Sequence, residues 1–224
     1  VPEAACIPII DDIPFAVAAL VGCAVTTGFG AVVNDAALRP GESLAVIGIG
    51  GVGINALLAA EVAGAGVILA VDIDPAKKAL ALANGATHFL NDGDHDLAEN
   101  VRALTQGRGV DAAIECTGRP SAMATAYHLT RPAGHVVIVG IAPKGADLTL
   151  PAIGFPGSKK RLIGSIYGGG IPERDIHRIL DLYSKGRLKL DAQIGARIGL
   201  AQVNQAMRWL EQGILARTMI EFAA

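Results

Sequence analysis

The chain has 224 residues, of which 51% are apolar and only 4% aromatic, so its core has to be built from Ala, Val, Ile and Leu. The net charge of -2 leaves no basic excess, which argues against a nucleic acid or an anionic membrane as partner. Cys6, Cys23 and Cys116 form no CxxC pair and cannot make a disulfide framework, so we expect a cytoplasmic protein.

Two long uncharged stretches, 15–33 and 44–60, could each satisfy a hydropathy search for a membrane span. Glycines interrupt both, and Thr26 and Thr27 lie in the middle of the first. A buried strand that runs into a buried helix face has the same apolar density, and we favour that interpretation. The chain opens on Val1 without a signal peptide or an initiator Met, which suggests a processed, excised or truncated chain.

From residue 42 onward, short apolar runs alternate with helix-like segments. The predicted strands are 43–48, 67–72, 88–91, 112–116, 135–140 and 162–167. The predicted helices between them are 52–63, 75–84, 97–105 and 121–130. The strands are continuously apolar rather than alternating, which is typical of a parallel sheet that is covered on both faces. We therefore predict an α/β fold, a doubly wound parallel six-stranded sheet of the Rossmann type.

The two ends of the chain differ from this pattern. An apolar helix is expected to lead toward Cys23 after a proline-rich start, and helices over 172–184 and 200–212 precede a final strand over 216–222. We predict a dinucleotide-binding domain over 25–167. The segments 1–24 and 168–224 are then flanking pieces of an incomplete catalytic domain.

The strongest motif is the GxGxxG string over 48–53, which follows a predicted strand and opens a predicted helix. Gly48 allows the tight turn, Gly50 lets a pyrophosphate approach the backbone, and Gly53 lets the helix pack closely on the strand. Gly51 and Val52 supply the first amides of the helix, whose positive end favours phosphate. The alternative is a purely structural strand–helix turn.

An acidic residue ends the next predicted strand. Asp72 lies where it can accept hydrogen bonds from both adenine-ribose hydroxyls and would repel a 2′-phosphate. Asp74 competes for this role, but it is placed as an N-cap before Pro75. We therefore predict NAD rather than NADP as cofactor.

These motifs and several others occur in an order that is characteristic of one family. The segments are 20–30 (LVGCAVTTGFG), 48–53 (GIGGVG), 71–74 (VDID), 85–87 (GAT), 115–118 (ECTG), 134–140 (GHVVIVG) and 216–218 (ART). Together they resemble the zinc-dependent alcohol dehydrogenases of the medium-chain dehydrogenase/reductase family. The likeness covers essentially the whole chain and is greatest to class III-like bacterial members, including glutathione-dependent formaldehyde dehydrogenases.

The resemblance implies a role for individual positions. It makes Cys23 the third protein ligand of the catalytic zinc, although a lone cysteine in an apolar run is more often a small buried group. It brings a further set of side chains to the cofactor: Thr27, Lys77, Cys116, Thr117, Val139, Ile141, Tyr167 and Arg217. The alternative role for Thr27 is helix capping, and the alternative for Lys77 is a solvated charge on the surface. The Cys6 and Cys116 thiols are expected to be packing groups.

The family's other zinc ligands, its proton relay and its structural-zinc lobe would lie upstream of residue 1, and none of the five histidines matches a ligand. We therefore expect a fragment with no catalytic residue of its own, taken from an enzyme that exchanges hydride between an alcohol or aldehyde and NAD. The resemblance also implies a homodimer, or a dimer of dimers, joined along the strand at 161–167. The alternatives are a polyol dehydrogenase, a zinc-free quinone reductase, or a non-catalytic NAD-binding module, although such a module has no need of Cys23.

Overall fold

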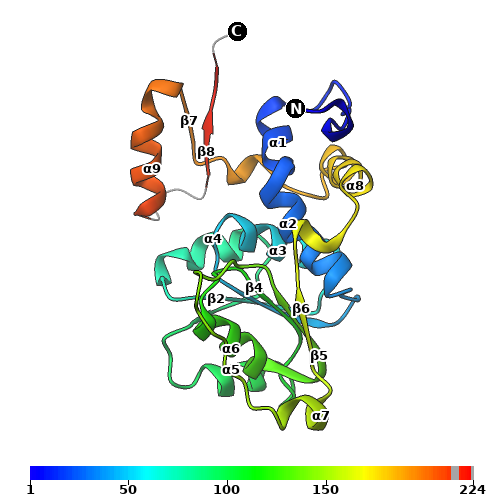
Figure 1. Cartoon of the computed structure of the whole chain (residues 1–224), viewed down its shortest axis with the longest axis vertical. Helices are drawn as coiled ribbons and strands as arrows, with labels where there is room; N and C mark the ends of the chain where they lie inside the picture. The colour runs from blue at the N-terminus through cyan, green and yellow to red at the C-terminus, as the bar shows by residue number, and fades with distance from the viewer. Residues whose placement is uncertain (213–216, 223–224) are drawn as a thin grey trace.

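A six-stranded parallel sheet forms the centre of this computed structural model, which describes residues 1–212 and 217–222 (Figure 1). The strands are β1 (Ser43–Ile47), β2 (Val67–Asp72), β3 (His88–Asn91), β4 (Val110–Glu115), β5 (Thr130–Ile138) and β6 (Arg161–Gly164). Their order is β3-β2-β1-β4-β5-β6, and every neighbouring pair is parallel. The predicted doubly wound fold is confirmed.

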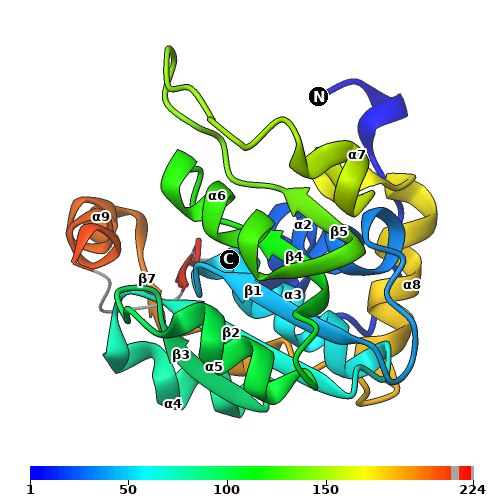
Figure 2. The same ribbon diagram turned by 90° about the horizontal axis from the view of Figure 1, so that it is seen from below.

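Helices cover both faces of the sheet, which is why its strands are continuously apolar. Leu44 and Val46 of β1 pack in the cluster that holds α3 (Gly51–Val62) and the first long helix. Ala45 and Ile47 face the opposite way, into the cluster of α5 (Leu97–Leu104) and α6 (Pro120–Leu129). Figure 2, seen from below, shows α5 and α6 in front of the strands. The shorter elements here are η4 (Pro75–Lys77), α4 (Lys78–Ala83) and α7 (Gly154–Ser158).

The first long helix extends well beyond the predicted stop near Cys23. It consists of α1 (Phe15–Leu20) and α2 (Thr26–Gly30), each followed by a wider π-helical turn, η2 (Val21–Val25) and η3 (Ala31–Asp35). Thr26, the first residue of α2, donates its hydroxyl to the carbonyl of Val21 at the start of η2, five residues back, at 2.6 Å. The predicted boundary between residues 24 and 25 falls inside this helix, and the division into domains stays a prediction.

The same helix, Phe15–Asp35, is long and apolar enough to cross a membrane by length and composition. Its most apolar window is 61% buried, against the sheet helices and α8 (Pro172–Ser184). Burial to this extent is typical of the core helix of a globular domain.

The C-terminal part lies on the side of the sheet that also carries α1 and α8 (Figure 1). It contains η6 (Asp191–Gln193), β7 (Ala196–Ile198), η7 (Leu200–Gln202), α9 (Val203–Glu211) and β8 (Thr218–Ile220), and β7 pairs with β8 in parallel. A short η1 (Glu3–Ala5) lies at the other end of the chain. The last strand was predicted over 216–222, and the observed β8 is shorter. The first residue of the predicted strand, Ala216, lies outside the described residues.

Two buried amides connect this returning segment to the sheet domain. The side chains of Asn55 in α3 and Gln193 in η6 exchange two hydrogen bonds, at 2.8 and 2.9 Å, and both residues are buried. Buried amides need partners of this kind, so the pair fixes how the C-terminal segment lies on α3.

Candidate functional site

A cavity of about 260 Å³ opens at the carboxyl ends of the neighbouring strands β1 and β4, where the order of the strands in the sheet reverses. Its lining comes from the ends of β1 and β2 and from the segments that follow β1 to β4: Ile47, Gly48, Ile49, Gly50, Val71, Asp72, Ile73, Lys77, Asp92, Cys116, Thr117 and Arg119. In a doubly wound sheet, the chain leaves in opposite directions from such a point, and the resulting crevice is the usual place for a ligand.

The glycine turn between β1 and α3 forms one side of the cavity. Gly48 has a φ of +91°, in the region that favours glycine, and its amide donates to the carbonyl of Val71 at 2.8 Å. A Cβ on Gly53 would lie 2.0 Å from the carbonyl oxygen of Gly48, whereas a Cβ on Gly50 would meet nothing within 4 Å. The turn is thus closely packed beneath Gly53 and open above Gly50, next to the first amides of α3.

Arg217 reaches this turn from the far end of the chain. A Cβ on Gly51 would lie 2.1 Å from its guanidinium, and its Nε is buried with no hydrogen-bond partner among the described residues. A buried guanidinium donor beside the N-terminus of a helix is a place where an anion is stabilised. The residues present therefore fit a phosphate group at the glycine turn.

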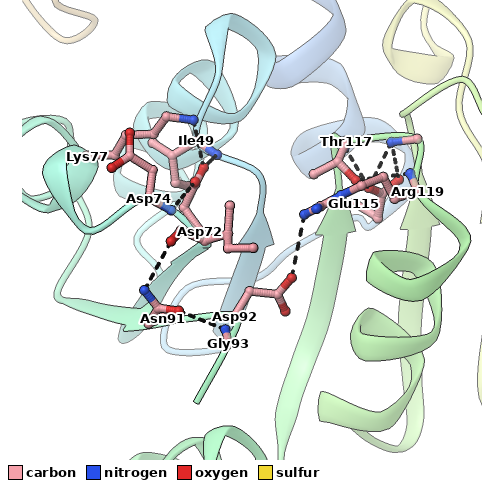
Figure 3. Close-up of polar contacts among 12 residues, drawn as sticks. Ile49, Asp72, Asp74, Lys77, Asn91, Asp92, Gly93, Glu115, Thr117 and Arg119 are labelled. Atoms are coloured by element: carbon pink, nitrogen blue, oxygen red, sulfur yellow. Dashed lines mark hydrogen bonds and ion pairs between the residues drawn. The ribbon is translucent and has the colours of Figure 1, made fainter. Parts of the chain in front are cut away.

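Asp72, at the end of β2, faces this turn (Figure 3). Its carboxylate accepts from the amide of Ile49 at 2.6 Å, the amide of Asp74 at 3.0 Å and the ammonium of Lys77 at 3.1 Å. Asp74 instead caps the next turn by accepting from the amide of Ala76 at 2.9 Å. Of these two carboxylates, it is therefore Asp72 that lines the cavity beside the glycine turn.

Glu115 organises the opposite wall. It is fully buried, and its carboxylate accepts from the amide and the hydroxyl of Thr117, at 2.6 and 2.5 Å, and from the amide of Gly118 at 3.0 Å. Burial raises the pKa of the intervening Cys116 thiol far above its ordinary range, and the charge of Glu115 adds to the shift. Cys116 therefore borders the cavity as a neutral thiol.

The other predicted cofactor residues lie beyond the ends of β5 and β6 and on α2. Val139 and the exposed Ile141 follow β5, and Tyr167 follows β6, which ends three residues earlier than predicted because Tyr167 turns the chain with a φ of +53°. Thr27 lies on α2, half-buried.

Tyr167 also joins the end of β6 to the turn that carries Cys23. The Tyr167 hydroxyl donates to the carbonyl of Gly22 at 2.6 Å. Burial, and in second place the neighbouring Cys23, raise the pKa of the Tyr167 phenol above its ordinary value. The exposed Cys23 thiol therefore lies beside the last strand of the sheet.

Cys23 does not make a metal site with the part of the chain that the structure describes. Among residues 1–212 and 217–222, no three His, Cys, Asp or Glu side chains converge in a way that could hold an ion. Protein zinc sites use at least three side-chain ligands. A zinc ion on Cys23 therefore needs ligands from elsewhere.

Two charged lining residues, Asp92 and Arg119, were not predicted from the sequence. Asp92 follows β3 and Arg119 follows β4, and Arg119 Nη2 lies 3.7 Å from Asp92 Oδ2. Their position after the carboxyl ends of two parallel strands was the available signal, but it points to the cavity only once the order of the strands is known.

Comparison with known proteins places the chain in a family. The zinc-binding dehydrogenase family matches residues 51–185. The S-(hydroxymethyl)glutathione dehydrogenase of Paracoccus denitrificans is 33% identical over 98% of this chain, and the class-3 alcohol dehydrogenase of Cereibacter sphaeroides is 33% identical over 99% of it. The crystal structure of benzyl alcohol dehydrogenase from Acinetobacter calcoaceticus superposes on 97% of the chain with a TM-score of 0.92 and 31% identity.

The chain spans about 60% of the length of these relatives: 60% and 61% of the two dehydrogenases and 59% of the crystallised protein. The family match, the identity over nearly the whole chain and the shared fold agree with one another. The chain belongs to the zinc-binding dehydrogenase family.

Proposed function

We propose that the chain is the NAD(H)-binding part of an alcohol dehydrogenase, in which hydride moves between an alcohol or aldehyde carbon and the nicotinamide. The observation that carries the proposal is the pairing, across one cavity, of the Asp72 carboxylate with a glycine turn that is open at Gly50. The alcohol or aldehyde substrate class is inferred from the relatives, which are named for S-(hydroxymethyl)glutathione and benzyl alcohol. A cytoplasmic location is part of the same proposal.

Each part of the cavity has a task in this mechanism. Asp72 would accept from the ribose hydroxyls, and Lys77 holds the Asp72 carboxylate in place through an ion pair at 3.1 Å. The first amides of α3 and the guanidinium of Arg217 would hold the pyrophosphate, which would give Arg217 Nε the partner that this atom lacks among the described residues. NAD supplies the carbon that takes up hydride, and the protein orients it.

The orientation of the nicotinamide is assigned to residues from three elements. We propose that Thr27 on α2, Val139 and Ile141 after β5, and Tyr167 after β6 border the ring. The bond from the Tyr167 hydroxyl to the Gly22 carbonyl keeps this border next to Cys23. We propose Cys23 as one ligand of a zinc ion whose other ligands come from outside these residues.

The test of this proposal is a set of three measurements on the purified chain. NADH should bind with saturation, seen as a change in nicotinamide fluorescence, because the residues proposed to hold the ribose and the phosphates all lie in this chain. Zinc should be far below one equivalent by mass spectrometry, and short alcohols should not drive NAD reduction, because one thiolate does not retain the metal.

An Arg217→Gln variant tests the phosphate contact in the NADH titration, since it removes the charge while keeping a polar side chain of similar length. We expect its NADH affinity to fall about tenfold or more, which corresponds to one charge-assisted contact. Stoichiometric zinc with alcohol-dependent NADH production would show that the 224 residues already form a working enzyme. Absence of NADH binding would overturn the proposal.

We also propose that two copies join along β6, as a dimer or a dimer of dimers. β6 is an edge strand, and Leu162 on it is 41% exposed. An open apolar edge strand tends to pair with another strand. Sedimentation at micromolar concentration should therefore give a dimer or tetramer, and a Leu162→Lys variant should shift it toward monomer. A clean monomer for the unmodified chain would contradict this assembly.

A further inference from the structure

Asp92 occupies the part of the cavity between the two walls described above. Its amide donates to the carbonyl of Asp72 at 3.1 Å, and the neighbouring Asn91 side chain ties the turn to Ile73 at 3.2 Å and to Gly93 at 2.7 Å. The Asp92 side chain is only 14% exposed although it lies on a loop. The hydrogen bonds of this turn therefore fix the backbone that holds the Asp92 carboxylate at the cavity.

Arg119 reaches Asp92 from the opposite wall, as Figure 3 shows. The Arg119 amide donates to the Thr117 hydroxyl at 3.1 Å, which the buried Glu115 fixes in turn. The 3.7 Å between the guanidinium and the carboxylate exceeds the usual length of a charge-assisted hydrogen bond, about 2.7–2.9 Å. The carboxylate of Asp92 thus keeps acceptor capacity for a further donor.

Inside the cavity, an apolar slot adjoins this carboxylate. Ile73, an exposed isoleucine on one side, and Cys116 and Thr117 on the other are part of its lining. Under the proposed function, Asp72 takes the adenosine ribose, so the base attached to that ribose enters the slot. Asp92 and Arg119 are then the charged groups nearest to the edge of the base.

We propose that Asp92 selects the base of the dinucleotide by accepting a hydrogen bond from the 6-amino group of adenine. An ionised carboxylate is an acceptor only, so it favours the amino donor of adenine and repels the 6-oxo acceptor of hypoxanthine. Arg119, at 3.7 Å, holds the carboxylate on its side of the slot. The inference rests on the proposed function, because it requires that Asp72 binds the ribose.

The experiment compares NADH with its deaminated analogue, reduced nicotinamide hypoxanthine dinucleotide, in which a 6-oxo group replaces the 6-amino group and the adjacent N1 gains a proton. Fluorescence titration of the unmodified chain should give an affinity for NADH that is about tenfold higher or more, as expected for one hydrogen bond to a charged group. Asp92→Asn replaces the carboxylate by an amide that can either donate or accept. We expect this variant to bind the two dinucleotides within about twofold of each other.

Asp94→Asn is the matched control, since it removes the same charge from an exposed position two residues further on. It should keep the preference of the unmodified chain. If Asp92 only stabilises the loop, Asp92→Asn would weaken both dinucleotides equally and leave their ratio unchanged, which would overturn the inference. Equal affinities in the unmodified chain would also overturn it while leaving the proposed function in place, whereas failure to bind NADH would remove both.

Discussion

NADPH is expected to bind this chain on the order of a hundredfold more weakly than NADH. The 2′-phosphate would meet the Asp72 carboxylate, which is buried and already accepts three hydrogen bonds. Mispairing a buried charge in this way costs roughly 2–5 kcal/mol, and about 2.7 kcal/mol corresponds to a hundredfold. Lys77 offsets part of the repulsion, but its side chain is 28% exposed against 4% for Asp72, so solvent screens the lysine more strongly.

Two variants assign this discrimination to one carboxylate. Asp72→Asn keeps an acceptor for the amide of Ile49 but removes the charge, and Asp72→Ala removes both; each should bring the two affinities close together. Asp74→Asn preserves the cap on Ala76 and should leave the NADH preference intact. Fluorescence titration of both reduced cofactors measures the ratio. Comparable affinities in the unmodified chain, or a preference that survives Asp72→Ala, would contradict the assignment.

Most of the fold follows from local patterns in the sequence. The continuous apolar runs of β1, β2 and β4 predict strands that are buried on both faces, and the alternation with helices predicts their parallel order. The long helix Phe15–Asp35 was missed beyond Cys23 because Thr26, Thr27 and the glycines 28 and 30 have low helix propensity. Packing against α3 and α8 overrides that propensity, which the sequence does not reveal.

The candidate site divides in the same way. The glycine turn directly follows one strand and Asp72 ends the next one, so their spacing alone identifies them as candidates. Asp92 and Arg119 follow β3 and β4, which β2 and β1 separate in the sheet, so their approach depends on how the two loops extend over the carboxyl ends of those strands. The contact of Arg217 with Gly51 depends on the returning C-terminal segment, and no local pattern reports it.

The glycines of the turn should respond differently to the addition of one methyl group. Gly50→Ala is expected to fold as stably as the unmodified chain, because a Cβ at Gly50 would meet nothing within 4 Å and φ is -99°. The pyrophosphate would meet that methyl group, and overpacking of this kind costs about 1–3 kcal/mol, or roughly five- to 150-fold in NADH affinity. Thermal unfolding and fluorescence titration measure the two effects separately.

Gly53→Ala should show the opposite order of effects. Its Cβ would lie 2.0 Å from the carbonyl oxygen of Gly48, a backbone atom that can move only if the whole turn moves. We therefore expect a midpoint of thermal unfolding that is lower by several degrees, since a loss of 1 kcal/mol lowers it by about 2–4 °C at this size. NADH binding should weaken as a consequence of the displaced turn. If Gly50→Ala instead lowers the unfolding midpoint and leaves NADH affinity unchanged, the open space above Gly50 is not where the pyrophosphate binds.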